Sequence, residues 1–224
     1  MKKDVEIIFI DINNINLKLN NDNPQNEIVE KKDEELLSKK IISHFIDNNI
    51  LIDLEKKENE FFLQYSFIFK TGNNTSCGCK FFYFNKVYNE KFNIDKPLFI
   101  FCDIGDSKTL TLLKEFIEYI KKSDSKDVKI SILGIKKSKN VNNLKKEVII
   151  KLFNDEELDF KYNEFDLSEN FNENEEEDEE IFEEIDKTIE VEIITLHNCE
   201  EVNHIVGEKM DEEARQNSSK CNIF

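Results

Sequence analysis

The stretch KPLFIFCDIGDSKTLTLLKEFIEYIKKSDSKDVKISILGIKKS, residues Lys96–Ser138, decides the fold class. It begins with a continuous apolar run, Leu98 to Cys102, that is typical of a strand buried on both faces. Asp106 or Ser107 is expected to cap a helix in which apolar residues recur at helical spacing. Val128 to Leu133 follows as a second buried strand. Strand, crossover helix and strand form a right-handed βαβ unit, so the sequence predicts an α/β fold with a parallel sheet.

The remaining segments extend this unit into a larger sheet. The expected elements are a strand at Val5 to Ile10, a helix at Glu34 to Asn48, a hairpin of strands at Ile50 to Leu54 and Phe61 to Phe69, a helix at Lys139 to Phe153, a strand at Phe160 to Phe165 and a helix at about Glu179 to Val191. Thr71 to Lys80 is expected to be a loop, and Phe81 to Tyr88 a strand or a short helix. This order predicts a doubly wound, mostly parallel sheet of about six strands with one antiparallel edge strand.

The chain is long enough for one sizeable core followed by a tail. We expect a single domain over residues 1–192 and a flexible tail over residues 193–224, where the apolar pattern fades. Residues 13–32 are rich in asparagine and are interpreted as a solvated loop or an insertion. The nineteen phenylalanines are enough apolar side chains to form a hydrophobic core.

Charge and cysteine content limit the classes of partner and the compartment. The 31 basic and 48 acidic residues give a net charge of -17, which argues against a nucleic-acid partner. Five cysteines without framework spacing indicate reduced thiols in the cytosol. No apolar run has the length of a membrane span, and MKKDVEIIFIDI is too short and acidic for a signal peptide. We therefore expect a cytoplasmic protein.

Several local strings are similar to those of one family. LFIFCDIGDSKTLTLLKEFIEYIKK, SKKIISHFIDNN, ISILGIKKS, FKYNEFDLSEN and IFEEIDKTI match, in order and in part, its strand-and-helix segments. Together with the order of elements, they resemble the Ras-like small GTPase domain, most closely its Rab branch, over roughly residues 5–192. The resemblance implies a GTP-binding fold that uses Mg²⁺ and regulates partners through its switch surface.

The phosphate-binding loop of that family, GxxxxGK[ST], matches DEELLSKK here. Asp33 and Ser38 stand at the glycine positions, where a side chain prevents the backbone amides from wrapping phosphates. Lys39 matches the family lysine, although an isolated helix lysine is more often simply solvated. Lys40 replaces the hydroxyl that binds Mg²⁺.

The other nucleotide motifs also depart from the family pattern. No threonine precedes Thr71, so the effector-loop threonine has no counterpart. The DxxG motif is placed at FKTG, residues 69–72, with Phe69 at the metal-organising aspartate. Ile135 and Ser138 replace the base-reading Asn and Asp, which leaves Lys136 as the one matching residue. In the last motif, Asp166, Leu167 and Ser168 stand for Ser-Ala-Lys.

The resemblance therefore implies a pseudo-GTPase without nucleotide binding or hydrolysis. Lys39 and Lys136 are the remaining candidates for nucleotide contact, and we expect no catalytic residue, no metal ligand and no cofactor. Two alternatives stay open. The first is a divergent active GTPase that binds GTP and Mg²⁺ through an unrecognised loop, and the second is a soluble α/β interaction module without GTPase ancestry.

The chain ends in Cys-Asn-Ile-Phe, which fits a C-a-a-X prenylation box with Cys221 as the lipid acceptor. A prenylated protein is expected on the cytosolic face of a membrane, binding protein partners through its switch-like surface. One lipid holds a protein only reversibly, so stable attachment requires a partner. The alternative is a chance cysteine near the terminus.

Other candidate sites are weaker. Cys77-Gly78-Cys79 lacks the second ligand pair of a zinc site and the two-residue spacer of a redox motif. His44 lies among apolar helix positions and is interpreted as a residue at the edge of the core. The acidic run that leads into the last helix is most simply solvated, with a docking surface for a basic partner as the alternative.

Overall fold

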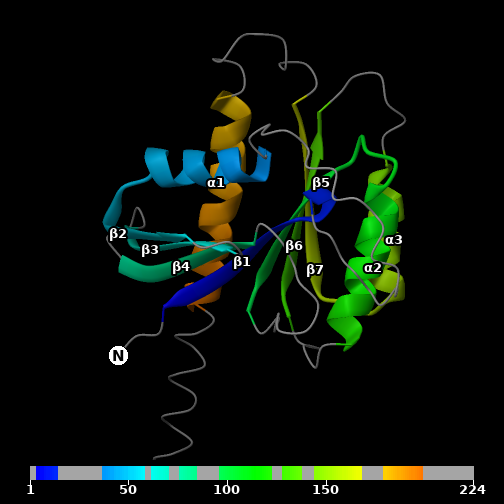
Figure 1. Cartoon of the computed structure of the whole chain (residues 1–224), viewed down its shortest axis with the longest axis horizontal. Coiled ribbons are helices and arrows are strands. Elements are labelled where there is room, and N and C mark those ends of the chain that lie inside the picture. Colours follow the sequence, from blue (N-terminus) through cyan, green and yellow to red (C-terminus); the bar gives the residue numbers. More distant parts are fainter. Residues whose placement is uncertain are drawn as a thin grey trace, which may run out of the picture.

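A seven-stranded mixed sheet forms the centre of the computed structural model, in the order β2-β3-β4-β1-β5-β6-β7 (Figure 1). The structure describes residues 4–14, 37–58, 62–70, 76–84, 96–122, 128–137, 144–167 and 179–198. The strands are β1 (Val5–Asp11), β2 (Leu51–Glu58), β3 (Phe62–Lys70), β4 (Ser76–Phe84), β5 (Leu98–Asp103), β6 (Ile130–Lys136) and β7 (Phe160–Asp166). β1 is parallel to both of its neighbours, β4 and β5, and β6 and β7 continue in the same direction.

The antiparallel part of the sheet differs from the expected single edge strand. β3 is antiparallel to both β2 and β4, so β3 alone among the seven described strands runs against the others, and it lies one position inside the edge. The expected hairpin is confirmed, but β2 extends to Glu58. The segment Ser76–Lys80, which we predicted as loop, is the first half of β4. Its residues alternate between buried and at least partly exposed positions, as a strand with one covered face requires.

Helices cover both faces of the sheet, which confirms the α/β class (Figure 1). They are α1 (Leu37–Asn48), α2 (Thr109–Lys122), α3 (Lys146–Asp155) and a helix over residues 179–198, here called the C-terminal helix. A single 3₁₀ turn, η1 (Ile12–Asn14), follows β1. α1 and the C-terminal helix pack on one face, and α2 and α3 pack on the other. None of the described helices is long and apolar enough to cross a lipid bilayer.

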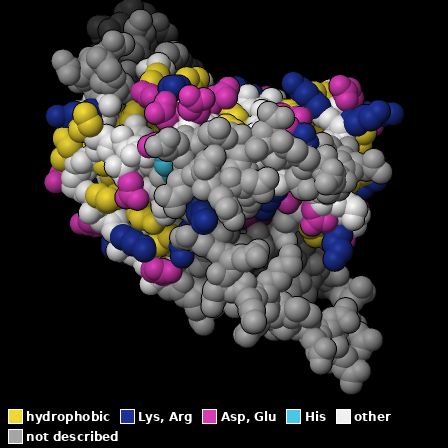
Figure 2. All heavy atoms as spheres, turned by 90° about the horizontal axis from the view of Figure 1, so that it is seen from above, with side chains coloured by type: hydrophobic (Ala, Val, Ile, Leu, Met, Phe, Trp, Pro, Cys, Tyr) yellow, Lys and Arg dark blue, Asp and Glu magenta, His cyan; other side chains and the backbone are white. Residues whose placement is uncertain are grey.

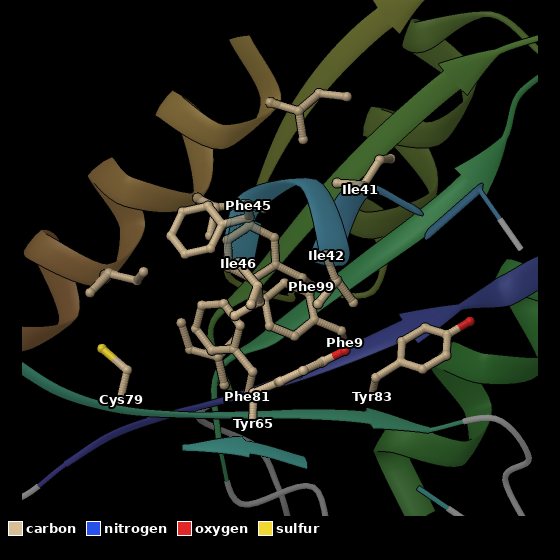
Figure 3. Packing of buried hydrophobic residues seen from close by; sticks show 14 of the residues in the cluster. Phe9, Ile41, Ile42, Phe45, Ile46, Tyr65, Cys79, Phe81, Tyr83 and Phe99 are labelled. Atoms are coloured by element: carbon tan, nitrogen blue, oxygen red, sulfur yellow. The ribbon is translucent and has the colours of Figure 1, made fainter. Parts of the chain in front are cut away.

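Aromatic rings dominate the core under α1 and the C-terminal helix (Figure 3). Phe9, at the centre of β1, has its ring centroid 4.7 Å from that of Phe81 and 5.2 Å from that of Phe99. Phe45 of α1 closes this layer from above, 5.5 Å from Phe81. Because β1 is flanked by strands on both sides, Phe9 packs against rings from β4 and β5, and Phe45 of α1 packs on the same Phe81 ring. This packing fixes the position of α1 over the end of β1.

The boundaries of two helices differ from the sequence expectation. α3 begins at Lys146 rather than near Lys139, and Lys145 directly before it has extended backbone. The C-terminal helix continues to residue 198, so the boundary that we placed at residue 193 falls inside it. Ile193 is fully buried and Leu196 is 7% exposed. The apolar spacing therefore extends at least one turn into the segment that we interpreted as tail.

Candidate functional site

The carboxyl ends of the parallel strands meet at one edge of the sheet. In open α/β sheets, ligands bind in the crevice outside these ends, where the chain leaves neighbouring strands in different directions. β1 occupies that position here, because its connection leads to α1 on one face whereas the connection after β5 leads to α2 on the other. The described side chains that follow β1, β5, β6 and β7 are therefore the candidates for a site.

Asp11, the last residue of β1, belongs to a buried hydrogen-bond network. The hydroxyl of Ser38, in the first turn of α1, donates to Asp11 Oδ2 at 2.8 Å and lies 2.9 Å from the hydroxyl of Tyr83 on β4. Asp11 is 7% exposed, and Ser38 and Tyr83 are each 1% exposed. Burial raises the pKa of the Tyr83 hydroxyl, which keeps it protonated as a donor. The backbone N–H of Asn13 donates to the second oxygen, Asp11 Oδ1, at 3.2 Å.

This network places a carboxylate at the beginning of a helix. The first N–H groups of a helix have no partner within the helix and carry a partial positive charge, so this position favours an anion such as a phosphate. Asp11 supplies an anion from within the chain. Neither Asp11 nor Tyr83 belongs to a sequence motif, and the available signal was a polar residue directly after the buried strand VEIIFI.

Asn13 connects the end of β1 to the next βα unit, which consists of β5 and α2. Its side-chain carbonyl accepts the backbone N–H of Asp103 at 2.8 Å, and its amide donates to Thr109 Oγ1 at 2.8 Å and to Asp106 Oδ2 at 3.2 Å. The other oxygen of Asp106 accepts the backbone N–H of Lys108 at 2.9 Å. Asp106 thus closes the turn directly before α2, whose first residue is Thr109. All hydrogen-bonding groups of the Asn13 amide are thus used in joining β1 to β5 and α2.

The two predicted nucleotide-contact positions lie at this edge. Lys39 follows Ser38 in the first turn of α1, and Lys136 ends β6, two strands from β1 and so about 10 Å away. Lys136 Nζ lies 2.6 Å from Asp166 Oδ2, its register partner on β7. The side chain of Lys136 is therefore engaged by a carboxylate of the protein. Cys221 lies outside the described residues.

The placement of the DxxG motif at FKTG is wrong. Since β3 runs against β1, its last residues, Phe69 and Lys70, lie at the opposite edge of the sheet, where β1 begins. The strand that lies beside β1 and parallel to it is β4, which ends at Phe84. The sequence after Phe84 reads Asn-Lys-Val-Tyr, with neither aspartate nor glycine. The motif is thus absent from the corrected position as well.

Two further motif positions are apolar and buried, whereas Lys40, at the Mg²⁺-binding hydroxyl position, is exposed on α1. Ile135 is 2% exposed and Leu167 is fully buried, and both belong to the core beneath the C-terminal helix. Neither side chain has a polar atom to bind a base. Asp33, Thr71, Ser138 and Ser168 lie outside the described residues.

The surroundings of Cys77 and Cys79 indicate a structural role and not a reactive one. The sulfurs of Cys77 and Cys79 lie 3.8 Å apart on the covered face of β4, and each residue is 2% exposed. The hydrogen bond to Cys77, together with burial, raises the pKa of the Cys79 thiol. Such thiols are unreactive, because the thiolate is the nucleophile and the metal ligand. Within the described ranges, no three His, Cys, Asp or Glu side chains are grouped to hold a metal ion.

Comparison with known proteins assigns no family to the chain. No model of a known family matches the chain, and no curated protein matches it.

Proposed function

We propose that this chain is a degenerate member of the Ras-like small GTPases, nearest the Rab branch, that has lost GTP binding and hydrolysis. It would act as a prenylated, membrane-associated adaptor in vesicle traffic or signalling, and bind protein partners through the surface where the family has its switches. The mixed sheet with a central parallel β1, and helices on both faces, supports this ancestry at the level of architecture.

The buried carboxylate of Asp11 is the observation that carries the loss of nucleotide binding. It receives the hydroxyl of Ser38 at the beginning of α1, which corresponds to the phosphate side of the family pocket. A triphosphate brought to this helix terminus would face a negative charge with little solvent to screen it, since Asp11 is 7% exposed. Ser38 also fills, with a side chain, the space that a glycine leaves open for phosphate oxygens.

The hydrogen bonds of Asn13 support the same proposal. Asn13 already engages Asp103 and Thr109, so the turn after β1 is held against α2 by contacts within the protein. At β6, Lys136 is paired with Asp166, and the neighbouring Lys137 lies 3.6 Å from Asp103. Lys136 and Lys137, at the end of β6, thus have carboxylate partners of their own.

Titration with a fluorescent GTP analogue tests the proposal. Full-length protein and a competent small GTPase as positive control are titrated in the presence of Mg²⁺. We expect no saturable signal for this chain up to the highest usable protein concentration. Saturable binding with a dissociation constant in the micromolar range or below would reject the loss of binding and favour the divergent active GTPase.

The lipid and the partner are tested separately. Cells expressing the chain are fed a radiolabelled isoprenoid, and the wild type is compared with Cys221→Ser. We expect label in the wild type alone, together with its recovery in the membrane fraction. Equal label in both proteins would remove the membrane part of the proposal and leave the soluble interaction module.

A further inference from the structure

The C-terminal helix carries isoleucine at every fourth position of its buried side. The four residues are Ile181, Ile185, Ile189 and Ile193. The last three are fully buried in the core that this helix shares with the sheet and α1, and Ile181 packs at the edge of the same core. α1 lies across this helix rather than along it (Figure 1). The same side chain therefore fills successive turns of the buried face.

Such a repeat makes apolar packing insensitive to the position of a helix along its own axis. An α-helix rises about 1.5 Å per residue, so a screw movement by four residues shifts it about 6 Å along its axis and superposes its backbone on itself. After such a movement toward the C-terminal end, Ile181 would take the place of Ile185, and each later isoleucine would follow in turn. Residues 168–178 connect β7 to this helix, and a segment of that length can take up about 6 Å.

The buried carboxylates of the helix do not follow the four-residue repeat. Asp186 Oδ2 lies 2.9 Å from Nδ1 of His44 on α1, and Glu192 Oε2 lies 2.6 Å from Nζ of Lys161 on β7. The two acidic side chains are 10% and 8% exposed. Each contact joins the helix to a different element, so both depend on where the helix stands along its axis.

The shifted register would break both contacts. Phe182, four residues before Asp186, would lie opposite His44. Glu192 would leave its lysine and take the place of Leu196, which is 7% exposed and belongs to the core. A buried carboxylate without a partner is strongly unfavourable. The polar side chains thus distinguish two registers that the isoleucines alone leave nearly equivalent.

The exposed charges of the helix do not make this distinction. Lys187 lies 3.6 Å from Glu183 on the same helix, so this ion pair moves with the helix in any register. Acidic and basic side chains are intermixed on the surface of the described residues seen from above (Figure 2). Ion pairs in such contact with solvent contribute little to stability.

We propose that the contacts His44–Asp186 and Lys161–Glu192 select the register of the C-terminal helix, and that a register one turn further toward its C-terminal end becomes populated when they are removed. Fixing a register is the best attested use of buried polar groups between helices. This inference is independent of the proposed function. Residues 199–224 follow the helix, so the two registers place the start of that segment about 6 Å apart.

Distances between two spin labels on the full-length protein measure the register directly. One label is attached through Lys187→Cys, at a 71% exposed site on the helix. The other is attached through a cysteine that replaces one of three exposed lysines on other elements: Lys57 of β2, Lys122 of α2 or Lys151 of α3. Three reference sites ensure that an axial movement changes at least one distance. The background is Cys199→Ser/Cys221→Ser, in which the remaining native cysteines are buried.

The variant His44→Leu/Asp186→Leu/Glu192→Leu replaces the polar groups of both contacts on the two helices by apolar side chains. In the shifted register, the new leucine at position 192 takes the place of Leu196, so the core is again apolar. We expect one distance in the wild type, and in the variant a second distance, displaced by up to about 6 Å, in at least about a tenth of the molecules.

Glu183→Leu/Glu184→Leu is the matched control, because it removes two carboxylates from the exposed side of the same helix. It should show the wild-type distance alone. Glu192→Leu, which leaves the contact with α1 intact, should give a shifted fraction between those of the wild type and the triple variant. A single unchanged distance in both the triple variant and Glu192→Leu, or a second distance in the control as well, would overturn the proposal.

Discussion

Replacing Ser38 with alanine tests whether the network at the end of β1 holds α1 in place. The hydroxyl of Ser38 donates to Asp11 at 2.8 Å and meets Tyr83 at 2.9 Å, and Ser38 is 1% exposed. A hydrogen bond to a carboxylate contributes about 1.5–3 kcal/mol, and a bond between hydroxyls about 1 kcal/mol. Alanine is the better helix former by roughly 0.5 kcal/mol. We expect Ser38→Ala to lower the free energy of unfolding by about 2–3 kcal/mol.

A double-mutant cycle isolates the contribution of the Asp11 bond. In an Asp11→Ala background, the Ser38 hydroxyl keeps only Tyr83, so Ser38→Ala should cost about 1 kcal/mol or less. The difference, a coupling of about 1–2 kcal/mol, is free of the helix-propensity term because that term is common to both backgrounds. Urea unfolding followed by far-UV circular dichroism measures all four proteins, since the chain has no tryptophan.

A matched control comes from another serine. Ser66 on β3 is half-buried and accepts a hydrogen bond from Gln64 at 2.9 Å, and it lies at the level of Glu6, well down the sheet from Asp11. Ser66→Ala should therefore show no coupling with Asp11→Ala. A Ser38–Asp11 coupling below about 0.5 kcal/mol would refute the conclusion that the carboxylate holds the first turn of α1.

Two further predictions concern the sheet. A Cβ at Gly134 would lie 2.4 Å from the hydroxyl oxygen and 2.9 Å from Cζ of Tyr162, so Gly134→Ala should destabilise the protein by about 1–3 kcal/mol. The same substitution in a Tyr162→Leu background should cost clearly less, and equal costs in urea unfolding would contradict this contact. Cys77, Cys79 and Cys102 are buried. The hydrogen bond to Cys77 raises the pKa of the Cys79 thiol, and burial raises the pKa of the Cys102 thiol. In a Cys199→Ser/Cys221→Ser variant, a thiol reagent such as DTNB should thus react only on unfolding; rapid labelling of the folded protein would contradict their inert role.

The structure also shows why the sequence identified only some of the residues at the carboxyl edge of the sheet. Lys39 and Lys136 were identified as matches to known motifs, and the structure places both at the carboxyl edge of the sheet. Asp11 and Asn13, whose hydrogen bonds connect the end of β1 to α1 and α2, match no motif, because their role depends on partners distant in the sequence. Ser38 lies 27 positions from Asp11, and Thr109 lies 96 positions from Asn13.

The sequence by itself determined the α/β class, because periodicity is a local property. Continuous apolar runs specified β5 and β6, and helical spacing specified α2, since a residue's face in a helix or strand follows from its position in the repeat. The assignment of Ser76–Lys80 failed because Ser76 and Gly78, directly after Gly-Asn-Asn-Thr, have the composition of a turn. Pairing with β3 and β1 on either side overrides that weak local preference.

Only the tertiary structure decided strand direction and the contents of the site. Which strand lies beside β1 depends on hydrogen bonds between segments that are distant in the sequence. The same holds for the carboxylate of Asp11 at the beginning of α1 and for the pairing of His44 with Asp186 across two helices. Burial is the physical reason in both cases. Polar groups that have lost contact with water interact more strongly with each other, and an unpaired one costs free energy.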